Sequence, residues 1–354
     1  MAPTTDGDPA ERPARPSRRR NEEGRGPSML ADFEARAQAT RSDFEHRAAE
    51  ARQEFEDRAR ATKRQFDETQ EKIRARTGRN LLAAVGIGVL LGGTFLVSLI
   101  IWPPLFIVFG GALIGFTSFE LATALRHAGR LVPRVVSTVL GLAVAVVAFF
   151  FHVEGLWLAT IAAVLLVSLW RLGELLLPSH RVSGRDLALD LGAGVLIQLY
   201  VTFLAGFYLV LTGIEGGQWW TLASILIVVV TDIGAYAAGL SFGRHKMAPT
   251  ISPGKTWEGF AGSVLVAIIA GVLVAWLMLG LPWWFGVPMG IVFALVGTVG
   301  DLTESLIKRD LGVKDISSWL PGHGGFLDRL DSILPAGAVA YAMFLIAQTL
   351  QLTP

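Results

Sequence analysis

Residues 135–170 read VVSTVLGLAVAVVAFFFHVEGLWLATIAAVLLVSLW, and Glu154 is the only Asp, Glu, Lys or Arg among them. Crossing the hydrocarbon core of a bilayer takes about 20 apolar residues in a helix. The stretch is long enough for two short crossings, at 135–152 and 154–170. It therefore predicts membrane-spanning helices.

Similar apolar stretches continue on both sides of it, at 80–101, 104–124, 188–212, 219–241, 257–280, 282–304 and 332–351. Of the 354 residues, 52% are hydrophobic and 17% are charged, whereas soluble domains average about 25% charged. This composition excludes an ordinary soluble enzyme, and the absence of cysteine excludes disulfides, thiolate metal sites and a cysteine nucleophile. We predict an all-α, polytopic integral membrane protein of about nine transmembrane helices.

Residues 1–79 differ sharply, because they hold 18 of the 31 Lys and Arg residues and 16 of the 30 Asp and Glu residues. Residues 1–27 are rich in Pro, Arg, Gly and Glu, which is typical of a disordered tail. Residues 28–79 are expected to form an amphipathic helix whose Phe stripe repeats every 11 residues, at Phe33, Phe44, Phe55 and Phe66. Self-association, binding to the anionic inner leaflet and a solvated spacer helix are three interpretations that stay open.

The basic residues of 80–354, the expected transmembrane domain, predict its orientation. If the apolar stretches cross the membrane in order, all 13 lie on connections at one side. They are Arg126, Arg130, Arg134, Arg171, Arg181, Arg185, Arg244, Lys246, Lys255, Lys308, Arg309, Lys314 and Arg329. Because positive residues mark the cytoplasmic side, the helical tail and these connections are predicted to be cytoplasmic.

Acidic residues in or beside apolar stretches are functional candidates, because a charge there costs about 2.5–3.5 kcal/mol even on insertion scales. Five stand out: Glu120, Asp190, Asp232, Asp301 and Glu304. Glu120 and Asp190 lie near cytoplasmic ends, where contact with interfacial water or an arginine would give them a structural role. Asp232 lies near the middle of its stretch, and Asp301 lies one helical turn before Glu304. These three are the stronger functional candidates.

Residues 305–331, SLIKRDLGVKDISSWLPGHGGFLDRLD, are the segment richest in chemical groups. Asp328 and Asp331 share a face if the chain is helical from Phe326, and Asp301 can meet them from the preceding span. Carboxylate oxygens suit Mg²⁺, which usually keeps coordination positions for substrate phosphates. Glycines around His323 let the backbone approach a phosphate closely.

Four basic side chains in the same segment would balance phosphate charge. They are Lys308, Arg309, Lys314 and Arg329. The segment therefore predicts a Mg²⁺–polyphosphate site at the cytoplasmic face. The alternative is a basic loop held against anionic lipid head groups.

Residues 252–259, SPGKTWEG, contain the triplet GKT found in phosphate-binding loops of the GxxxxGK[ST] type. That type is excluded, because Pro249 stands where its first glycine is required and no strand pattern precedes it. Ser252 and Thr256 are instead predicted to start a helix, with Lys255 aimed at a phosphate.

The run from Ser305 to Asp331 resembles the signature of phosphatidate cytidylyltransferases (CDP-diacylglycerol synthases). The signature reads S-x-[LIVMF]-K-R, then K-D, a proline-glycine-histidine-glycine-glycine turn and D-R-x-D. Residues 232–236 and 252–259 resemble the two upstream motifs of the family, so the resemblance covers roughly residues 225–335. Ile233, Gly254 and Ser263 depart from the residues common in the family.

The resemblance implies transfer of a cytidylyl group from CTP to phosphatidate, giving CDP-diacylglycerol and pyrophosphate for phospholipid biosynthesis. It implies that Asp301 and Asp328 bind Mg²⁺, with room for a second cation. The implied catalytic set is Asp301, Asp328, Lys308, Arg309 and His323. Groups expected to bind CTP or its phosphates are Asp232, Ser252, Lys255, Thr256, Lys314, Arg329 and Asp331. The resemblance also implies a homodimer in a bacterial inner membrane, with membrane lipids around it and no nucleic-acid partner.

Rival functions remain in two classes. A CTP-dependent polyprenol or dolichol kinase-like transferase would make a phosphorylated alcohol, and the D-R-x-D signature disfavours it. A transporter would use the intramembrane acids as an ion pathway, but these acids gather at one face beside phosphate-type loops. A non-catalytic scaffold is harder to exclude than these two, although both signature aspartates are present.

Overall fold

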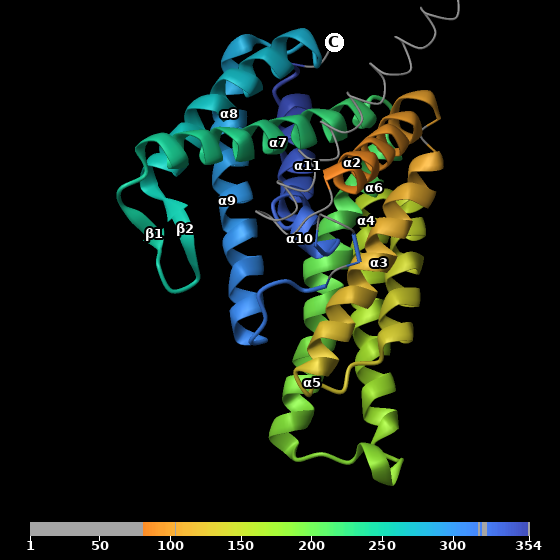
Figure 1. The fold of residues 1–354 in the computed structure, drawn as a ribbon. Helices are drawn as coiled ribbons and strands as arrows, with labels where there is room; N and C mark the ends of the chain where they lie inside the picture. Colours follow the sequence, from red (N-terminus) through yellow and green to blue (C-terminus); the bar gives the residue numbers. More distant parts are fainter. Residues whose placement is uncertain (1–80, 103, 318, 321–323, 353–354) are drawn as a thin grey trace, which may run out of the picture. The chain divides into compact units, whose positions relative to one another are not determined.

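The computed structural model describes residues 81–102, 104–317, 319–320 and 324–352. The expected tail at 1–27, the expected amphipathic helix at 28–79 and His323 lie outside the described residues. The described chain is almost entirely helical, which confirms the all-α class (Figure 1). The elements are α2 (Leu81–Leu96), η1 (Val97–Ile101), α3 (Leu105–His127), α4 (Arg134–Glu174), η2 (Pro178–His180), α5 (Gly184–Leu196), η3 (Ile197–Phe203), α6 (Leu204–Thr212), α7 (Gly217–Phe242), β1 (Lys246–Ala248), β2 (Ser252–Thr256), α8 (Trp257–Leu277), η4 (Trp283–Phe285), α9 (Gly286–Asp310), α10 (Leu327–Leu330) and α11 (Ile333–Thr349).

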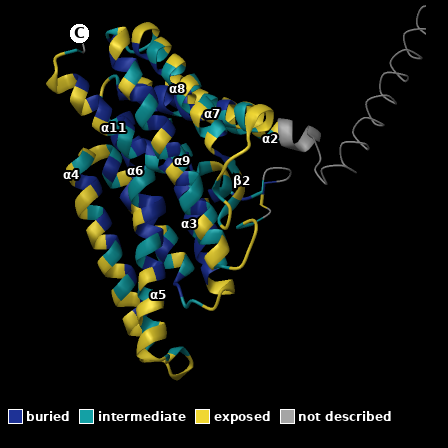
Figure 2. Cartoon of the chain, turned by 90° about the vertical axis from the view of Figure 1, so that its left-hand side faces the viewer, coloured by how far each residue is buried: buried dark blue, intermediate teal, exposed yellow. Residues whose placement is uncertain are grey.

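In the part of the chain that the structure describes, 7 helices are long and apolar enough to cross a membrane. They are α3, α4, α7 and α8, together with the composite helices Gly184–Thr212, Trp283–Asp310 and Leu327–Thr349. A shorter apolar helix, Gly86–Ile101, lies in the first predicted span. Large side chains such as Phe151 and Leu158 are 67% and 70% exposed on the outer faces, as lipid contact requires (Figure 2). The polytopic membrane architecture is confirmed.

Helix α4 contains two of the predicted spans in one run of 41 residues. At His152 the backbone leaves the helical region (φ 54°, ψ −144°), so two helices meet there. The two ends of α4 lie close together, because the Asp190 carboxylate accepts hydrogen bonds from both Leu131 N and Arg171. The chain therefore turns back at His152. The count of about nine spans depends on such internal breaks and stays a prediction.

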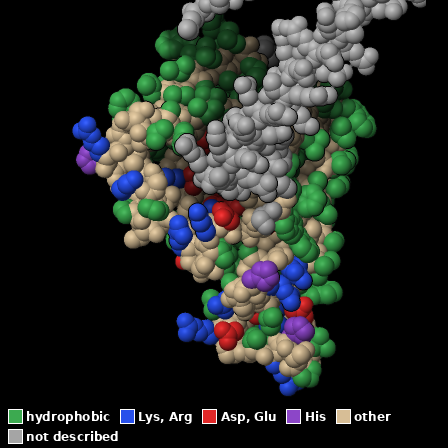
Figure 3. Space-filling view, viewed as in Figure 1, with side chains coloured by type: hydrophobic (Ala, Val, Ile, Leu, Met, Phe, Trp, Pro, Cys, Tyr) green, Lys and Arg blue, Asp and Glu red, His purple; other side chains and the backbone are tan. Residues whose placement is uncertain are grey.

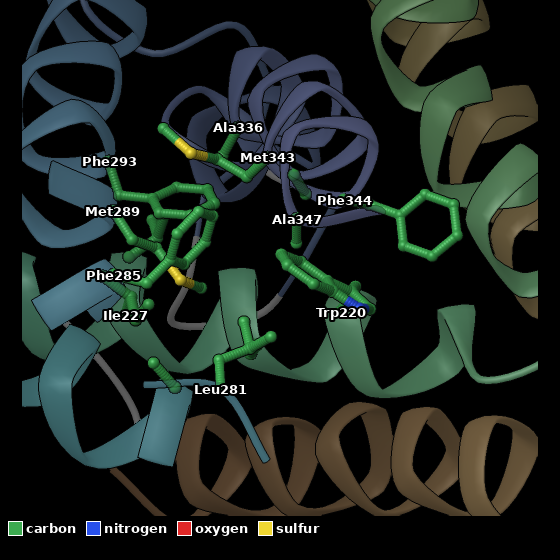
Figure 4. Close-up of a cluster of buried hydrophobic side chains, with 14 of the residues drawn as sticks. Trp220, Ile227, Leu281, Phe285, Met289, Phe293, Ala336, Met343, Phe344 and Ala347 are labelled. Carbon is green, nitrogen blue, oxygen red and sulfur yellow. The ribbon is translucent and has the colours of Figure 1, made fainter. Parts of the chain in front are cut away.

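Aromatic and small residues pack α7, α8, α9 and α11 together. The Trp220 ring lies 5.7 Å from the Phe344 ring and 6.4 Å from the Phe285 ring, and Figure 4 shows this cluster between the helices. Glycine lets α8 and α9 approach closely, since a Cβ added to Gly271 would lie 3.0 Å from the backbone nitrogen of Gly290. This packing holds α8 firmly against α9, and both helices carry residues of the candidate site.

A short antiparallel hairpin, β1–β2, connects α7 to α8 and was not expected from the sequence. Lys246 pairs with Thr256, and Ala248 pairs with Ser252. Thr256 Oγ1 also accepts a hydrogen bond from Gly259 N at 3.1 Å, which confirms that Thr256 caps a helix. The prediction that Ser252 starts a helix is wrong. Its segment is engaged in the β ladder, so helical geometry begins only after Thr256.

Charged side chains are segregated on the face shown in Figure 3. Lys, Arg, His and acidic side chains gather on its left and lower parts, while hydrophobic side chains are frequent at its top left and along its right edge. Polar contacts hold the hairpin within the charged part. Glu258 accepts hydrogen bonds from the backbone nitrogens of Arg244 and His245 at 3.1 and 3.2 Å. Arg309 Nε on α9 donates to Ile251 O at 3.2 Å, which fixes the hairpin beside α9.

Candidate active site

A cavity of about 500 Å³ lies between α7, the hairpin, the start of α8 and the middle of α9. This volume is within the usual range for small-molecule sites. The polar residues that line it are Thr231, Asp232, Tyr236, Ser252, Lys255, Thr256, Ser263, Thr298 and Asp301. Five residues that the sequence predicted for the site therefore come together here: Asp232, Ser252, Lys255, Thr256 and Asp301.

The strongest contact in this cavity joins the hairpin to α9. Lys255 Nζ lies 2.8 Å from Asp301 Oδ2 and donates to the backbone oxygen of Thr298 at 3.3 Å. The side chain of Lys255 is 19% exposed and that of Asp301 is 38% exposed. Asp232, on α7, interacts electrostatically with both. The ammonium and the two carboxylates thus face the same polar space from three elements.

Asp331 adds a third carboxylate to this group. Asp331 interacts electrostatically with Asp301, Asp232 and Lys255. It does so although the end of α9 and a long loop separate it from Asp301 in the sequence. Gly300 makes the approach possible, because a Cβ there would lie 2.8 Å from the Pro335 side chain. Three carboxylates and one ammonium thus interact electrostatically, and their formal charge sums to −2 when all are ionised. We call Asp232, Lys255, Asp301 and Asp331 the acidic cluster.

A second ionic group lies one helical turn further along α9. Lys308 Nζ lies 2.6 Å from Glu304 Oε2 and 3.2 Å from Asp328 Oδ1. Asp328 Oδ2 accepts a hydrogen bond from Gly325 N at 2.8 Å. Glu304 is buried, and its Oε1 has no hydrogen-bond partner among the described residues. The signature residues Lys308 and Asp328 are therefore brought together, as the sequence predicted.

Glu120 on α3 anchors the chain just before this second group. Its carboxylate accepts hydrogen bonds from Phe326 N at 3.1 Å and Leu327 N at 2.8 Å, and from the hydroxyl of Ser317. The residue is 1% exposed. It caps the first turn of α10 from 206 residues away in the sequence.

Replacing Glu120 by glutamine should lower kcat/KM about 10- to 100-fold in the transfer assay described below. A neutral amide is a weaker acceptor for two backbone N–H groups, and hydrogen bonds to charged groups contribute about 1.5–3 kcal/mol. The matched control is Glu215→Gln, at an exposed glutamate between α6 and α7. Equal activity of the two variants would contradict an anchoring role for Glu120.

Three other predicted residues lie away from the cavity. Arg309 is engaged with the tip of the hairpin. Lys314 is exposed in the loop after α9. Arg329 lines a different, apolar cavity. Their predicted roles in binding phosphate stay predictions.

Several polar residues at the site were not predicted from the sequence: Thr231, Tyr236, Ser263 and Thr298 in the cavity, and Tyr200 near the carboxylates. Thr298 lines the cavity one turn before Asp301, and its i, i+3 spacing on α9 was a usable signal. Tyr200 lies in the π-helical segment η3 and interacts electrostatically with Asp331, Glu304 and Asp301. Its buried hydroxyl has no hydrogen-bond partner among the described residues. Nothing local in the sequence points to Tyr200, because its position depends on how η3 packs.

The donor set suits a divalent cation that shares its coordination with phosphate. Within the described residues, no group of three His, Asp or Glu side chains forms a preassembled metal site. Mg²⁺ needs no such group, because one or two carboxylates with substrate phosphates are its usual ligands in nucleotide sites. The formal −2 charge of the acidic cluster and the unpartnered Glu304 Oε1 both favour a cation. The residues present therefore fit the Mg²⁺ that the resemblance implies.

Comparison with known proteins supports the same interpretation. The chain is 34% identical over 278 residues to the phosphatidate cytidylyltransferase of Mycobacterium bovis, covering 75% of this chain and 89% of the relative. It is 35% identical over 276 residues to that of Mycobacterium leprae, covering 76% and 88%. The phosphatidate cytidylyltransferase of Brucella suis is 42% identical over 144 residues, covering 40% and 53%. The cytidylyltransferase family model matches residues 82–347, which include both ionic groups, and the chain belongs to this family.

Proposed function

We propose that the protein transfers a cytidylyl group from CTP to phosphatidate, giving CDP-diacylglycerol and pyrophosphate. The observation that carries the proposal is the acidic cluster beside the D-R-x-D segment, in a membrane protein whose relatives are named phosphatidate cytidylyltransferases. A cavity lined by both carboxylates and an ammonium suits a triphosphate with a divalent cation. The apolar helices around it suit a lipid acceptor.

The reaction forms a bond between a phosphate oxygen of phosphatidate and the α-phosphorus of CTP. The bond from that phosphorus to the bridging oxygen of the β-phosphate breaks, and pyrophosphate leaves with the electron pair. The attacking oxygen is already anionic near neutral pH, so no strong general base is required. Positioning and neutralisation of charge therefore provide most of the catalysis.

Each ionic group has a distinct role in this proposal. Lys255 reaches into the cavity from the hairpin, where its ammonium pairs with triphosphate oxygens as they displace it from Asp301. Asp301 and Asp328 are the carboxylates that would hold Mg²⁺, with Asp232 and Asp331 as further acidic groups near Asp301. Bound Mg²⁺ supplies Lewis-acid stabilisation of charge on the transferred and leaving phosphates. Lys308, between Glu304 and Asp328, keeps Asp328 ionised and in position.

The proposal includes the setting of the enzyme. The predicted placement of all basic residues of 80–354 on one side favours a cytoplasmic site, since CTP is a cytosolic nucleotide. Residues 80–354 would form the catalytic membrane domain in a bacterial inner membrane, with the tail at the cytoplasmic side. The homodimer implied by the resemblance belongs to the same proposal.

The test uses purified protein in detergent with Mg²⁺, dioleoyl phosphatidate and CTP labelled at either the α- or the γ-phosphorus. We expect label from the α position in the lipid product and label from the γ position in pyrophosphate. Transfer of the γ label to an added polyprenol would instead identify the kinase-like alternative. Failure of the folded protein to transfer either label would contradict the proposed function.

A further inference from the structure

A second cavity, of about 240 Å³, is lined in part by the D-R-x-D segment, at Arg329 and Leu330. Helices α2, α3 and α6 form most of its wall, and nearly all the side chains that line it are apolar. Phe95, Phe106 and Phe109 pack against one another at one end, with ring centroids 6.0 to 6.3 Å apart.

The other end of this apolar cavity is formed by the signature segment itself. Phe326, Arg329, Leu330 and Ile333 all line it. Their spacing of three, one and three residues is that of one helical face. Arg329 is the one Lys or Arg among the described residues that line this cavity. The apolar space is thus bounded by the same segment that carries Asp328, whose carboxylate belongs to the second ionic group.

The two sides of the signature segment therefore differ in chemistry. Asp328 and Asp331 belong to the ionic groups described above, whereas Arg329 and Leu330 lie between them in sequence and line the apolar cavity. Residues of one helical turn therefore contribute both to a site for charged phosphates and to an apolar space suited to hydrocarbon. The geometry matches a substrate that carries both a phosphate and a long alkyl chain.

We propose that the apolar cavity binds one acyl chain of the phosphatidate substrate and thereby sets chain-length preference. This inference rests on the proposed function and adds to it a binding site for the lipid tail. Continuity of the cavity with the signature segment favours the substrate over an unrelated membrane lipid. An unrelated lipid would have no need of a wall formed by residues of the reaction site.

Two adjacent glycines on α2 offer a matched pair of variants. Gly92 lines the cavity, whereas Gly93 does not, and a Cβ added at either position would meet no atom within 4 Å. A leucine at position 92 therefore extends into the cavity without a clash at its Cβ, and a leucine at position 93 extends away from it. Both substitutions raise helix propensity equally, so they differ only in the direction of the added bulk.

The experiment compares wild type, Gly92→Leu and Gly93→Leu with dihexanoyl and dioleoyl phosphatidate at saturating CTP. We expect Gly92→Leu to lower kcat/KM for the dioleoyl substrate at least tenfold, with the dihexanoyl substrate and the KM for CTP changed less than twofold. Gly93→Leu should match wild type with both lipids. Gly92→Ala, which adds one methyl group, should lower kcat/KM for the dioleoyl substrate by an intermediate factor. It replaces the leucine variant in the comparison if that variant does not fold.

Two outcomes would overturn the inference. If Gly92→Leu lowered kcat/KM equally for both lipids, its effect would not act through binding of the acyl chain. If kcat/KM were unchanged for both lipids, the cavity would not hold a substrate chain. Both require that wild type makes CDP-diacylglycerol. If wild type makes none, it is the proposed function that fails, so the two failures are distinguishable.

Discussion

Replacement of Asp301 by asparagine is expected to lower kcat/KM for CTP at least about 1,000-fold, or about 4 kcal/mol of transition-state stabilisation. Asp301 is the residue at which the hairpin, α7 and α9 meet, through Lys255 at 2.8 Å and Asp232 by electrostatic interaction. The amide keeps the size of the side chain but removes its charge. It therefore weakens cation binding and leaves Lys255 without its carboxylate partner.

The matched control is Asp310→Asn, nine residues later on α9 at its exposed end. This variant should retain wild-type activity. The Mg²⁺ concentration that gives half-maximal rate should rise for Asp301→Asn and stay unchanged for the control. If Asp301→Asn kept more than a tenth of wild-type activity, the assignment of Asp301 to the metal would be wrong.

Replacement of Arg171 by leucine is expected to destabilise the folded protein by about 3–5 kcal/mol, the usual cost of leaving a buried charge without its partner. The Arg171 side chain is 1% exposed, and its Nη2 and Nε lie 2.9 and 3.1 Å from Asp190 Oδ2. The other carboxylate oxygen of Asp190 accepts from Leu131 N at 2.9 Å. Loss of the guanidinium leaves an anion that α3, α4 and α5 enclose.

Thermal unfolding of the purified variants in one detergent measures this effect. The double variant Arg171→Leu/Asp190→Leu should recover most of the lost stability, because it removes both charges rather than one. Arg181→Leu, at an exposed arginine in the loop before α5, is the control and should unfold like wild type. A single variant that unfolded at the same temperature as this control would contradict a structural role for the pair.

The membrane architecture could be predicted from the sequence, because the length and composition of the apolar stretches are enough to indicate membrane-spanning helices. The fold-back of α4 at His152 agrees with the division of 135–170 into two short spans. The β1–β2 hairpin was missed because its strands have 3 and 5 residues, too few for a period of two to be visible. The GKT triplet is visible in the sequence, but the position of Lys255 within strand β2 could not be predicted from it.

The sequence predicted the chemical groups of the site more completely than it predicted which of these groups pair with one another. Asp190 pairs with an arginine, which was one of the structural roles considered for it. Glu120 was open to the same explanation, yet it accepts hydrogen bonds from a loop more than 200 residues away. Such partners depend on tertiary packing and leave no local pattern. For the same reason, Tyr200 could not be identified beside the carboxylates.

Arg171 leaves the ribosome 19 residues before Asp190, the carboxylate that neutralises it. At about 5–20 residues per second, this interval is roughly one to four seconds. During it the nascent chain carries Arg171 at the end of an apolar helix with only Glu174, whose carboxylate lies 3.9 Å from Arg171 Nη1 in the folded protein, as an acidic neighbour. We expect the second half of α4 to wait at the aqueous side of the insertion channel until α5 emerges, so that the two helices enter the bilayer as a pair.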